Sequence, residues 1–372
     1  MNNNYDVILQ LRGLLAWKET IDEEIFYHPE HLEIDFNSRP GKEYKPGKDE
    51  LYIGMENNLQ ADQIRSEIKI ALDHHFEKTG KTPAKIIIEN IAVVTVKKKQ
   101  PGKAKSLFNK VAIVTGAAGA IGYGICRRLL EEGCLVAVTD LIQEKLDQFV
   151  SEFKEEFPGQ FIAVTMDVTD QASVTHAYDQ VKSQWGGIDI VIINAGIALV
   201  SSLIDMKLED FRRLERVNID GTLTTLKETA NSFITQGIGG DIVLVSTKNV
   251  FSPSANFGAY SATKAGSHQL ARIASLELAQ YGVRVNMVAP DGVFSGGSHK
   301  SGLWQEVGPD RMKARGLDEK GLEEYYKNRN LLKTKVTARH VANAVMFFLT
   351  RQAPTTGVTI PVDGGLPDAT PR

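Results

Sequence analysis

From about residue 108 to the end of the chain, short apolar runs alternate with longer segments whose apolar residues recur at helical spacing. The runs read VAIVTG, LVAVTD, FIAVTMD, IDIVIINAG, GDIVLVS and VRVNMVAP. Apolar strands of this length, separated by helical segments, are typical of a parallel sheet that helices cover on both faces. The pattern therefore predicts an α/β fold with a Rossmann-type doubly wound parallel sheet.

The first hundred residues follow a different pattern. Apolar residues recur every three or four positions from Leu59 to Phe76, ahead of Gly80, which predicts an amphipathic helix with a glycine stop. The stretch AKIIIENIAVVTV is rich in β-branched residues and predicts one strand or two short ones. Three prolines favour an irregular connection over residues 28–50. Residues 1–100 are thus expected to form a small α+β appendage.

The two patterns meet at KKKQPGKAK, a basic run with a proline and a glycine and no hydrophobic period. We expect residues 101–107 to be a linker to a main domain over residues 108–372. The appendage shows no catalytic constellation. His74 and His75 are adjacent, so they face apart on a helix, and no Cys or acidic cluster accompanies them, which speaks against a metal site.

Composition excludes several classes of partner. With 24% charged residues and a formal net charge of -3, the chain offers no electrostatic case for binding nucleic acid or an anionic membrane. The N-terminus lacks the features of a signal peptide and no stretch approaches the roughly 20 apolar residues of a membrane span, so the cytoplasm is expected. Cys126 and Cys134 fit no metal-type spacing and are expected to be reduced packing residues.

A glycine-rich turn follows the first apolar strand of the main domain. In KVAIVTGAAGAIGYGI, Gly116 permits a tight turn and Gly122 lets the next helix approach the sheet. Backbone N–H groups around Gly119, Ala120 and Ile121, at the helix start, can hold a pyrophosphate. The turn is therefore a candidate dinucleotide site, although a glycine-rich turn can also serve only as a loop.

Further polar residues stand where the following strands end. Asp140, 24 residues after Gly116, can accept hydrogen bonds from the adenosine ribose and would repel a 2′-phosphate, which predicts NAD in preference to NADP. Its other interpretation is a cap of the following helix. The next strand ends are expected at the same carboxyl edge of the sheet, where open α/β sheets bind ligands, and they carry Asp167, Val168, Asn194, Ala195 and Gly196.

The segment YSATK places a phenol and an ammonium four residues apart. On a helix, Tyr260 and Lys264 share a face, so both groups can act in one site. A free phenol has a pKa near about 10, so a cation beside it is needed to favour tyrosinate at working pH.

Over about residues 108–365, the chain resembles the short-chain dehydrogenase/reductase family in the order and spacing of its motifs. These motifs are TGAAGAIG, Asp140, DV, NAG, VNIDGT, YSATK, VRVNMVAP and VDGG. Ala120 replaces the family's usual middle glycine. The resemblance implies that Tyr260 is the general acid/base, that Lys264 lowers the pKa of its phenol and holds the nicotinamide ribose, and that Asn218 supports a proton relay.

The substrate-orienting hydroxyl of this family lies thirteen residues before the tyrosine, which is Thr247 here, and Ser246 is the alternative if the loop shifts by one residue. Pro290 and Val293 resemble cofactor contacts, although Asp291 replaces the usual glycine after the proline. Family members are commonly dimeric or tetrameric, so a homodimer or homotetramer is expected.

The run from APDGVF to NRNLL resembles the dehydrogenase half of proteins that fuse a class II aldolase to a short-chain dehydrogenase, and a truncated arrangement of this kind is similar to sorbitol-6-phosphate 2-dehydrogenases. Residues 1–100 would then be a noncatalytic aldolase-like relic. The resemblance implies a polyol or sugar phosphate as substrate, best sorbitol 6-phosphate, with a lactaldehyde or diol dehydrogenase as the alternative. Loop residues that could bind a polar or anionic substrate are Lys248, Asn249, Ser295, His299 and Lys300.

A non-enzyme remains as a third hypothesis, a dinucleotide-sensing or scaffolding protein that keeps the fold without turnover. A protein that only binds its ligand needs no acid/base tyrosine, so the YSATK segment argues for the enzyme.

Overall fold

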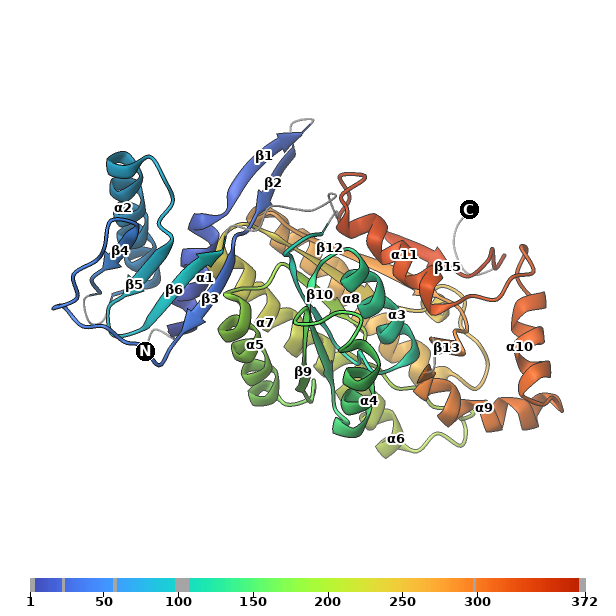
Figure 1. The fold of residues 1–372 in the computed structure, drawn as a ribbon. Coiled ribbons are helices and arrows are strands. Elements are labelled where there is room, and N and C mark those ends of the chain that lie inside the picture. Colours follow the sequence, from blue (N-terminus) through green and yellow to red (C-terminus); the bar gives the residue numbers. More distant parts are fainter. Residues whose placement is uncertain (1–3, 22–23, 56–58, 98–106, 297–298, 368–372) are drawn as a thin grey trace.

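The computed structural model describes the chain except residues 1–3, 22–23, 56–58, 98–106, 297–298 and 368–372 (Figure 1). An N-terminal module lies at one end of the molecule, the main domain follows it, and two C-terminal helices, α9 (Gly302–Arg315) and α10 (Glu319–Asn328), lie at the other end. The expected linker at residues 101–107 falls almost wholly outside the described residues.

The main domain is built on a seven-stranded sheet in the order β15-β12-β11-β10-β7-β8-β9, and every neighbouring pair is parallel. The strands are β7 (Val111–Val114), β8 (Leu135–Asp140), β9 (Phe161–Thr165), β10 (Ile190–Ile193), β11 (Gly240–Val245), β12 (Val283–Pro290) and β15 (Thr359–Val362). The prediction of a doubly wound parallel sheet is confirmed. Strand order reverses between β7 and β10, and the crevice outside this switch point is where such sheets bind ligands.

Helices cover both faces of this sheet and enclose two cores. One core holds α3 (Ala120–Glu131), α4 (Gln143–Phe153) and α11 (Ala338–Leu349), and the other holds α5 (Gln171–Trp185), α7 (Gly221–Gln236) and α8 (Gly258–Leu278). Strands β7, β8, β10 and β11 contribute side chains to both cores, which explains why they are apolar at almost every position. Cys126 and Cys134 are free and buried in the first core, as expected for packing residues.

The N-terminal module has a four-stranded sheet in the order β3-β6-β5-β4. The predicted amphipathic helix is α2 (Ala61–Thr79), and it stops at Gly80, which has a φ of 69°. The stretch AKIIIENIAVVTV forms two strands, β5 (Lys85–Ile88) and β6 (Ala92–Lys97). The irregular connection expected over residues 28–50 is wrong in part, because β3 (His31–Asp35) pairs antiparallel with β6 and β4 (Glu50–Ile53) begins at its end.

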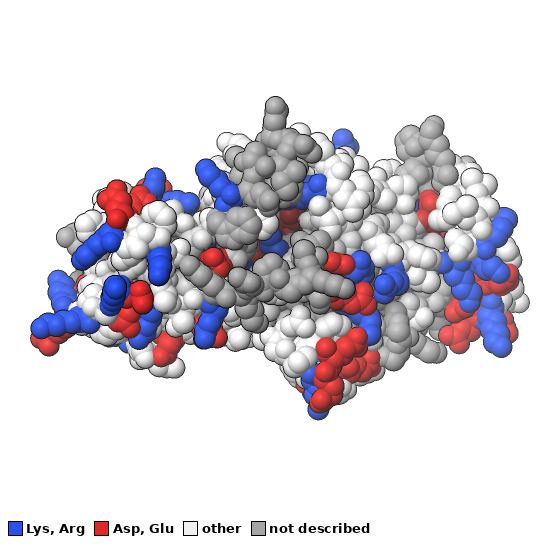
Figure 2. All heavy atoms as spheres, turned by 45° about the horizontal axis from the view of Figure 1, so that its top comes forward, with Lys and Arg blue, Asp and Glu red and all other residues white. Residues whose placement is uncertain are grey.

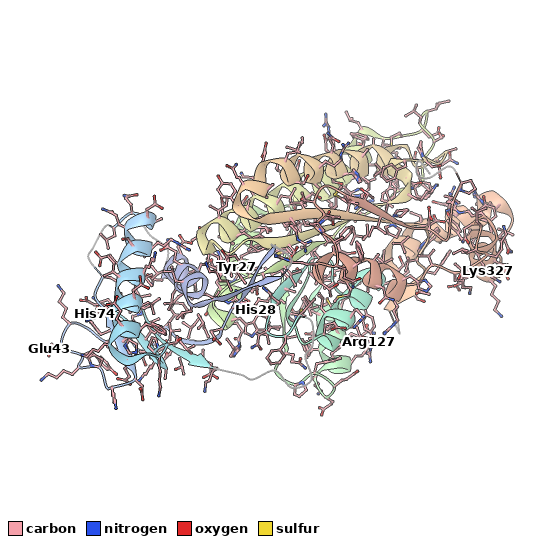
Figure 3. The ribbon with its side chains drawn as sticks, turned by 90° about the horizontal axis from the view of Figure 1, so that it is seen from above. Tyr27, His28, Glu43, His74, Arg127 and Lys327 are labelled. Carbon is pink, nitrogen blue, oxygen red and sulfur yellow. The ribbon has the colours of Figure 1, made fainter. Side chains whose placement is uncertain are left out.

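Two elements join the module to the main domain. Helix α1 (Asn4–Leu15) packs Val7, Ile8 and Leu11 into the core of the module and also lies against α5 and α7. The hairpin of β1 (Trp17–Ile21) and β2 (Glu24–His28) runs from the module toward the sheet, as Tyr27 and His28 show in Figure 3, and Lys110 Nζ donates to the Tyr27 carbonyl at 2.6 Å. The module is therefore in direct contact with the amino end of β7, and Arg12 of α1 bonds Asp189 just before β10.

On the face drawn in Figure 2, Asp and Glu atoms gather at the bottom of the view, and no comparable group of Lys and Arg atoms is seen. Lys and Arg atoms alternate with Asp and Glu atoms over the N-terminal module and over the opposite end of the molecule. Within the described residues, no helix is long and apolar enough to cross a membrane, and no three His, Cys, Asp or Glu side chains gather as metal ligands would. On α2, which carries His74 as labelled in Figure 3, His74 is exposed and His75 is buried.

Candidate active site

A cavity of about 530 Å³ opens at the carboxyl edge of the main sheet. Its wall is formed by the loops that follow β7, β8, β9, β10, β11 and β12 and by the start of α8. The structure brings most of the predicted cofactor residues into this wall, namely Gly116, Gly119, Ala120, Ile121, Asp140, Asp167, Val168, Asn194, Ala195, Gly196, Tyr260, Lys264, Pro290 and Val293. Gly122 lies behind the wall, in the first turn of α3.

The glycine turn leaves no room for side chains at two positions. Gly116 has a φ of 60°, and a Cβ there would lie 2.9 Å from the Ala195 Cα. A Cβ on Gly122 would lie 2.5 Å from the Gly116 carbonyl oxygen, so the first turn of α3 packs directly on the loop. Asn194 ties the two loops together, because its Nδ2 donates to the Thr115 and Gly116 carbonyls at 2.9 Å. The turn is thus preformed, as a pyrophosphate cradle requires.

Helix α3 begins at this turn without a capping side chain. Gly119 is its N-cap residue and makes no side-chain cap bond. The first N–H groups of a helix have no intrahelical partner, so a negative group at this position would meet several donors. The residues therefore fit the pyrophosphate of a dinucleotide.

Asp140 occupies the end of β8 as expected. Its Oδ2 accepts from the Ala118 amide at 3.2 Å and its Oδ1 from the Ile142 amide at 3.3 Å, while the side chain lines the cavity. The two backbone bonds fix the direction of the carboxylate. Because an ionised carboxylate has about four acceptor sites, it can still accept bonds from ribose hydroxyls.

Tyr260 and Lys264 lie one turn apart on α8, and both line the cavity. Burial raises the pKa of Tyr260 to about 12, with Thr247 opposing this by a hydrogen bond and Asp291 adding to it by its charge. The Nζ of Lys264 donates to the Val245 carbonyl at 2.8 Å. Burial is thus the largest influence on the phenol, and the expected lowering of its pKa by Lys264 stays a prediction.

Burial also acts on the lysine and lowers the pKa of Lys264 to about 8. Its Nζ faces the loop after β10, where a Cβ on Gly196 would lie 3.6 Å away. The ammonium therefore stands between the tyrosine helix and the predicted cofactor wall, with two of its three donors left after the bond to Val245.

The two hydroxyls at the end of β11 point to different partners. Thr247 lines the cavity with Tyr260 and opposes the rise of the phenol pKa, and its Oγ1 accepts from the Asn249 amide at 3.3 Å. Ser246 Oγ lies 2.9 Å from His268 Nδ1 instead. His268 is two turns after Tyr260 on α8, and burial lowers its pKa to about 4, so the imidazole is neutral. The geometry thus places Thr247, and not Ser246, at the phenol.

Asn218 lies in a π-helical turn, Arg216–Asp220, between α6 (Leu208–Glu215) and α7. Its side chain is 1% exposed, accepts from the Ile197 amide at 3.0 Å and donates to the Ile197 carbonyl and to Thr263 Oγ1, both at 3.0 Å. The asparagine therefore clamps the loop after β10 onto α8. Single π-helical turns of this kind are frequent at functional sites.

The structure places only some of the predicted substrate residues in the cavity wall. Lys248 and Asn249 line the cavity in the short helix η2 (Lys248–Val250). Ser295 is exposed on β13 (Ser295–Gly296) and is not among the described residues of the cavity wall. His299 and Lys300 form β14, and their side chains fall outside the described part of the structure.

Sequence reasoning missed the groups that complete this end of the cavity. Arg311 and Trp304 from α9, Tyr326 from α10 and Arg329 just after it all line the wall. Arg329 makes a two-pronged ion pair with Asp291, the residue that replaces the family's glycine. No motif marks the helices that carry these side chains, which come to the site only through the fold.

With fold and geometry established, comparison with known proteins identifies the family. The family model for short chain dehydrogenases matches residues 110–306. Sorbitol-6-phosphate 2-dehydrogenase of Escherichia coli is 30% identical over 261 residues, which cover 69% of this chain and 98% of that protein. The (-)-isopiperitenol/(-)-carveol dehydrogenase of Mentha piperita is 34% identical, over 70% of this chain and 95% of that protein.

The chain also matches the uncharacterized oxidoreductase YuxG of Bacillus subtilis, with 37% identity over 265 residues. That match covers 71% of this chain and only 38% of YuxG. Among solved structures, sorbitol-6-phosphate 2-dehydrogenase SrlD from Erwinia amylovora superposes with a TM-score of 0.63 at 28% identity, over 68% of this chain and 98% of that one.

This chain belongs to the short chain dehydrogenase family. It is accordingly an oxidoreductase that acts on CH–OH groups with a nicotinamide dinucleotide as cofactor.

Proposed function

We propose that this protein oxidises a secondary alcohol of a small polyol or sugar phosphate to the ketone with NAD, and that sorbitol 6-phosphate, which would yield fructose 6-phosphate, is the first substrate to test. The observation that carries the proposal is the cavity wall, which brings Thr247 and Tyr260 together with Lys264. The same wall contains Lys248, Arg311 and Arg329. One end of the cavity suits a carbinol and the other end suits a polar or negative group.

The protein's own groups would act as follows. Thr247 donates to or accepts from the carbinol oxygen and holds it at the phenol, and Tyr260 as tyrosinate takes the hydroxyl proton. Bound NAD would supply the hydride acceptor, carbon 4 of the nicotinamide ring. Lys264 stabilises the tyrosinate by its positive charge and has donors left for the nicotinamide ribose, while Asn218 holds the loop after β10 against α8.

The choice of NAD over NADP rests on Asp140. The carboxylate lines the cavity at the end of β8 and is held by two backbone amides. A 2′-phosphate on the adenosine ribose would bring like charges together, whereas free ribose hydroxyls can donate to the carboxylate. We expect Gly116, Gly119 and the start of α3 to hold the pyrophosphate.

The proposed substrate draws on the names of two relatives, the sorbitol-6-phosphate 2-dehydrogenases of Escherichia coli and Erwinia amylovora, together with the cationic end of the cavity. The alternative is a lactaldehyde or diol dehydrogenase, which the resemblance to fused aldolase proteins favours. Such small substrates would bring no negative group to Lys248, Arg311 and Arg329.

For the rest of the chain we propose that residues 1–100 are a noncatalytic, aldolase-like relic that serves assembly. Residues 108–372 would form the dehydrogenase domain. Contact between α1 and helices α5 and α7 supports a structural part for this module. We further propose a homodimer or homotetramer that works in the cytoplasm.

The test is reduction of NAD by the purified protein with sorbitol 6-phosphate, sorbitol and lactaldehyde-related diols side by side. Tyr260→Phe removes the acid/base group, and we expect turnover to fall by at least about 10²–10⁴-fold. The matched control is Tyr281→Phe, which alters an exposed phenol at the far end of α8.

Fast turnover of the phosphate only would support the sugar-phosphate dehydrogenase. Equal or better turnover of an unphosphorylated diol would move the assignment to the lactaldehyde group. Binding of NADH without turnover of any polyol would favour the sensor, and unchanged hydride transfer in Tyr260→Phe would end the proposed mechanism.

A further inference from the structure

Arg311 is the most unusual charged residue of the cavity wall. Its side chain is 4% exposed, and its Nε is buried with no hydrogen-bond partner among the described residues. The guanidinium lies over the Phe257 ring at 4.5 Å and donates to the Tyr326 hydroxyl at 3.3 Å, so the contacts recorded for it are with neutral groups. Burying an arginine with an unsatisfied donor and no counter-charge is costly, and a bound ion is one explanation for such a group.

Two more cations stand close to it. Lys248 is 6% exposed and gives two N–H groups to the Ser252 carbonyl and the Ser254 hydroxyl, which leaves one of its three donors unused in the described structure. Arg329 lies over the Tyr326 ring at 4.0 Å and pairs with Asp291. Among the described residues of this end of the wall, three cations thus share one carboxylate.

We infer that Arg311, with Lys248 beside it and Arg329 held by Asp291, forms a subsite that binds the phosphate group of the substrate while the reacting carbinol lies at Tyr260. The inference rests on the proposed function and adds to it the residues that select a phosphorylated substrate.

The subsite and the catalytic phenol are separated by a single aromatic ring. Phe257 carries the Arg311 guanidinium on its face and meets the edge of Tyr260, with ring centroids 5.9 Å apart. A substrate that reached both groups would need several bonds between its reacting carbon and its anionic end. A polyol phosphate meets this requirement, whereas a short diol fills only the end at Tyr260.

The arrangement suits a phosphate in particular. An arginine presents five donors in a planar fork that matches phosphate oxygens in pairs, and a lysine adds a point charge. Burial, with the positive charges of Arg329 and Arg311, lowers the pKa of Lys248 to about 8, although Asp291 opposes the shift. An anion between these groups would relieve their repulsion. A carboxylate shares part of this chemistry, so the test includes one.

The experiment is a calorimetric titration of inorganic phosphate into the full-length protein saturated with NAD, which keeps the pyrophosphate site filled. Acetate is titrated in parallel. Arg311→Gln is compared with Arg315→Gln, which lies one turn further along α9, rests on the Tyr325 ring and is not a described part of the cavity wall. We expect Arg311→Gln to weaken phosphate binding by about 10- to 100-fold and Arg315→Gln to change it less than about threefold.

The variant series covers the case in which Arg311→Gln does not fold. Arg311→Lys keeps the positive charge but loses the paired donors of the guanidinium, so it should bind phosphate with intermediate affinity. Lys248→Met should weaken phosphate binding independently. The inference is overturned if phosphate does not bind the NAD complex, if Arg311→Gln binds it as the wild type does, or if acetate binds as tightly as phosphate.

Failure of the proposed function would look different. If phosphate binds through Arg311 but no polyol or polyol phosphate is oxidised, the subsite stands and the proposed reaction falls. If sorbitol is oxidised as well as sorbitol 6-phosphate and phosphate does not bind, the dehydrogenase stands and the subsite falls.

Discussion

The two edges of the main sheet each bury an arginine, and the two arginines have opposite surroundings. At the amino edge, Arg12 of α1 is 1% exposed and bonds Asp189 through both terminal nitrogens, at 3.1 and 2.8 Å. Asp189 also accepts from the Val111 amide at 2.7 Å. At the carboxyl edge, Arg311 meets a phenyl ring and a phenol hydroxyl. One arginine is matched to a carboxylate and the other is not.

The different surroundings of Arg12 and Arg311 indicate a structural role for the first and a ligand-binding role for the second. Although burial by itself would raise the pKa of Asp189, the charges of Arg12 and Lys110 hold it below the ordinary range, so the pair remains ionised and bonded. A charge that already has its counter-charge fastens the N-terminal module to the sheet. A buried charge without one keeps its donors for a ligand, which is what the cavity requires.

The largest expected effect is at the amino edge. Arg12→Met leaves the Asp189 carboxylate buried without its partner, and such a change costs about 3–5 kcal/mol of unfolding free energy. Urea unfolding followed by fluorescence would measure it. The double variant with Asp189→Asn should recover part of the loss, because no unpaired charge remains. If the unfolding free energy of Arg12→Met were within about 1 kcal/mol of the wild-type value, the structural role assigned to the Arg12–Asp189 pair would be wrong.

The second prediction concerns the catalytic hydroxyl at the carboxyl edge of the sheet. Thr247→Ala removes the hydroxyl that bonds the Tyr260 phenol, and we expect kcat to fall by about 10²–10³-fold with little change in the unfolding midpoint. Ser246→Ala is the matched control, since its hydroxyl bonds His268, and it should lose much less activity. The assignment of the orienting hydroxyl would be reversed if Ser246→Ala were the more damaging variant.

The third prediction concerns pH. Because the pKa of Tyr260 is raised to about 12, the tyrosinate fraction grows with pH throughout the range in which the enzyme is assayed. The kcat/KM for alcohol oxidation should therefore rise by up to about tenfold per unit between about pH 7 and pH 9, and ketone reduction, which needs the neutral phenol, should not. Initial rates in both directions measure this. A flat oxidation profile would exclude a titrating tyrosine.

The same buried groups affect stability with opposite signs. Lys264 has a pKa of about 8 in the folded chain, below its ordinary 10.5, so the unfolded chain binds more protons between these values and stability rises with pH there. Tyr260 binds its proton more tightly when folded, so its contribution is lost as the pH rises above its ordinary value of 10.0. Neither effect explains a rate that rises from neutral pH.

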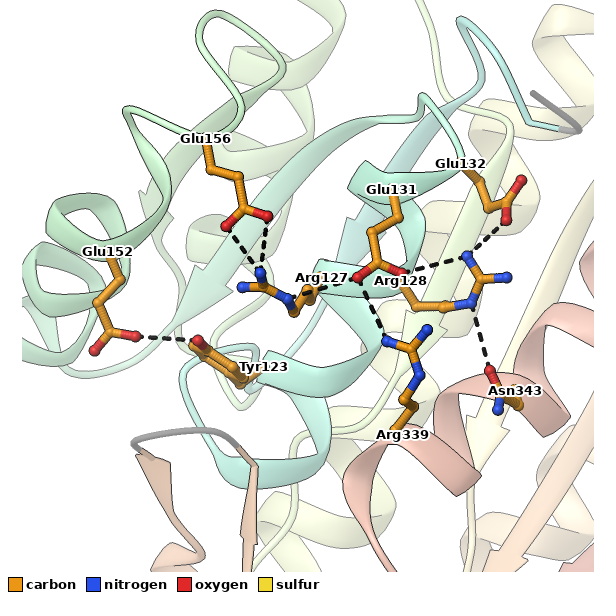
Figure 4. Close-up of polar contacts among 9 residues, drawn as sticks. All are labelled: Tyr123, Arg127, Arg128, Glu131, Glu132, Glu152, Glu156, Arg339 and Asn343. Carbon is orange, nitrogen blue, oxygen red and sulfur yellow. Dashed lines mark hydrogen bonds and ion pairs between the residues drawn. The ribbon is translucent and has the colours of Figure 1, made fainter. Parts of the chain in front are cut away.

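The smallest effect is expected on the outer surface. Figure 4 shows a network in which Arg127 pairs with Glu156 of the segment after α4, and Glu131 receives Arg127, Arg128 and Arg339 from α3 and α11. Arg127 and Glu156 are 37% and 47% exposed, so solvent screens the pair. Arg127→Ala should cost less than about 1 kcal/mol and leave turnover unchanged. A larger loss would mean that exposed pairs also fasten this fold.

Sequence patterns could locate the residues whose positions depend on local backbone geometry. The glycine turn, Asp140, and Tyr260 with Lys264 follow from strand ends, turn sterics and the helical repeat, and the structure brings them to one cavity. Strand β3 escaped prediction because three prolines surround it and its conformation depends on pairing with β6, far along the chain. The pKa of Tyr260 escaped for a related reason, since burial depends on the whole fold.

The sequence by itself determined the parallel sheet, the dinucleotide loop and the tyrosine–lysine helix, because periodicity and backbone sterics act within a few residues. Only the tertiary structure decided that Thr247 rather than Ser246 faces the phenol, that Arg12 is matched to Asp189, and that Arg311 reaches the cavity without a carboxylate. Each of these features depends on which residues, far apart in the sequence, are buried next to one another. The electrostatic energy of a buried charge depends on those neighbours, and a local sequence pattern does not reveal them.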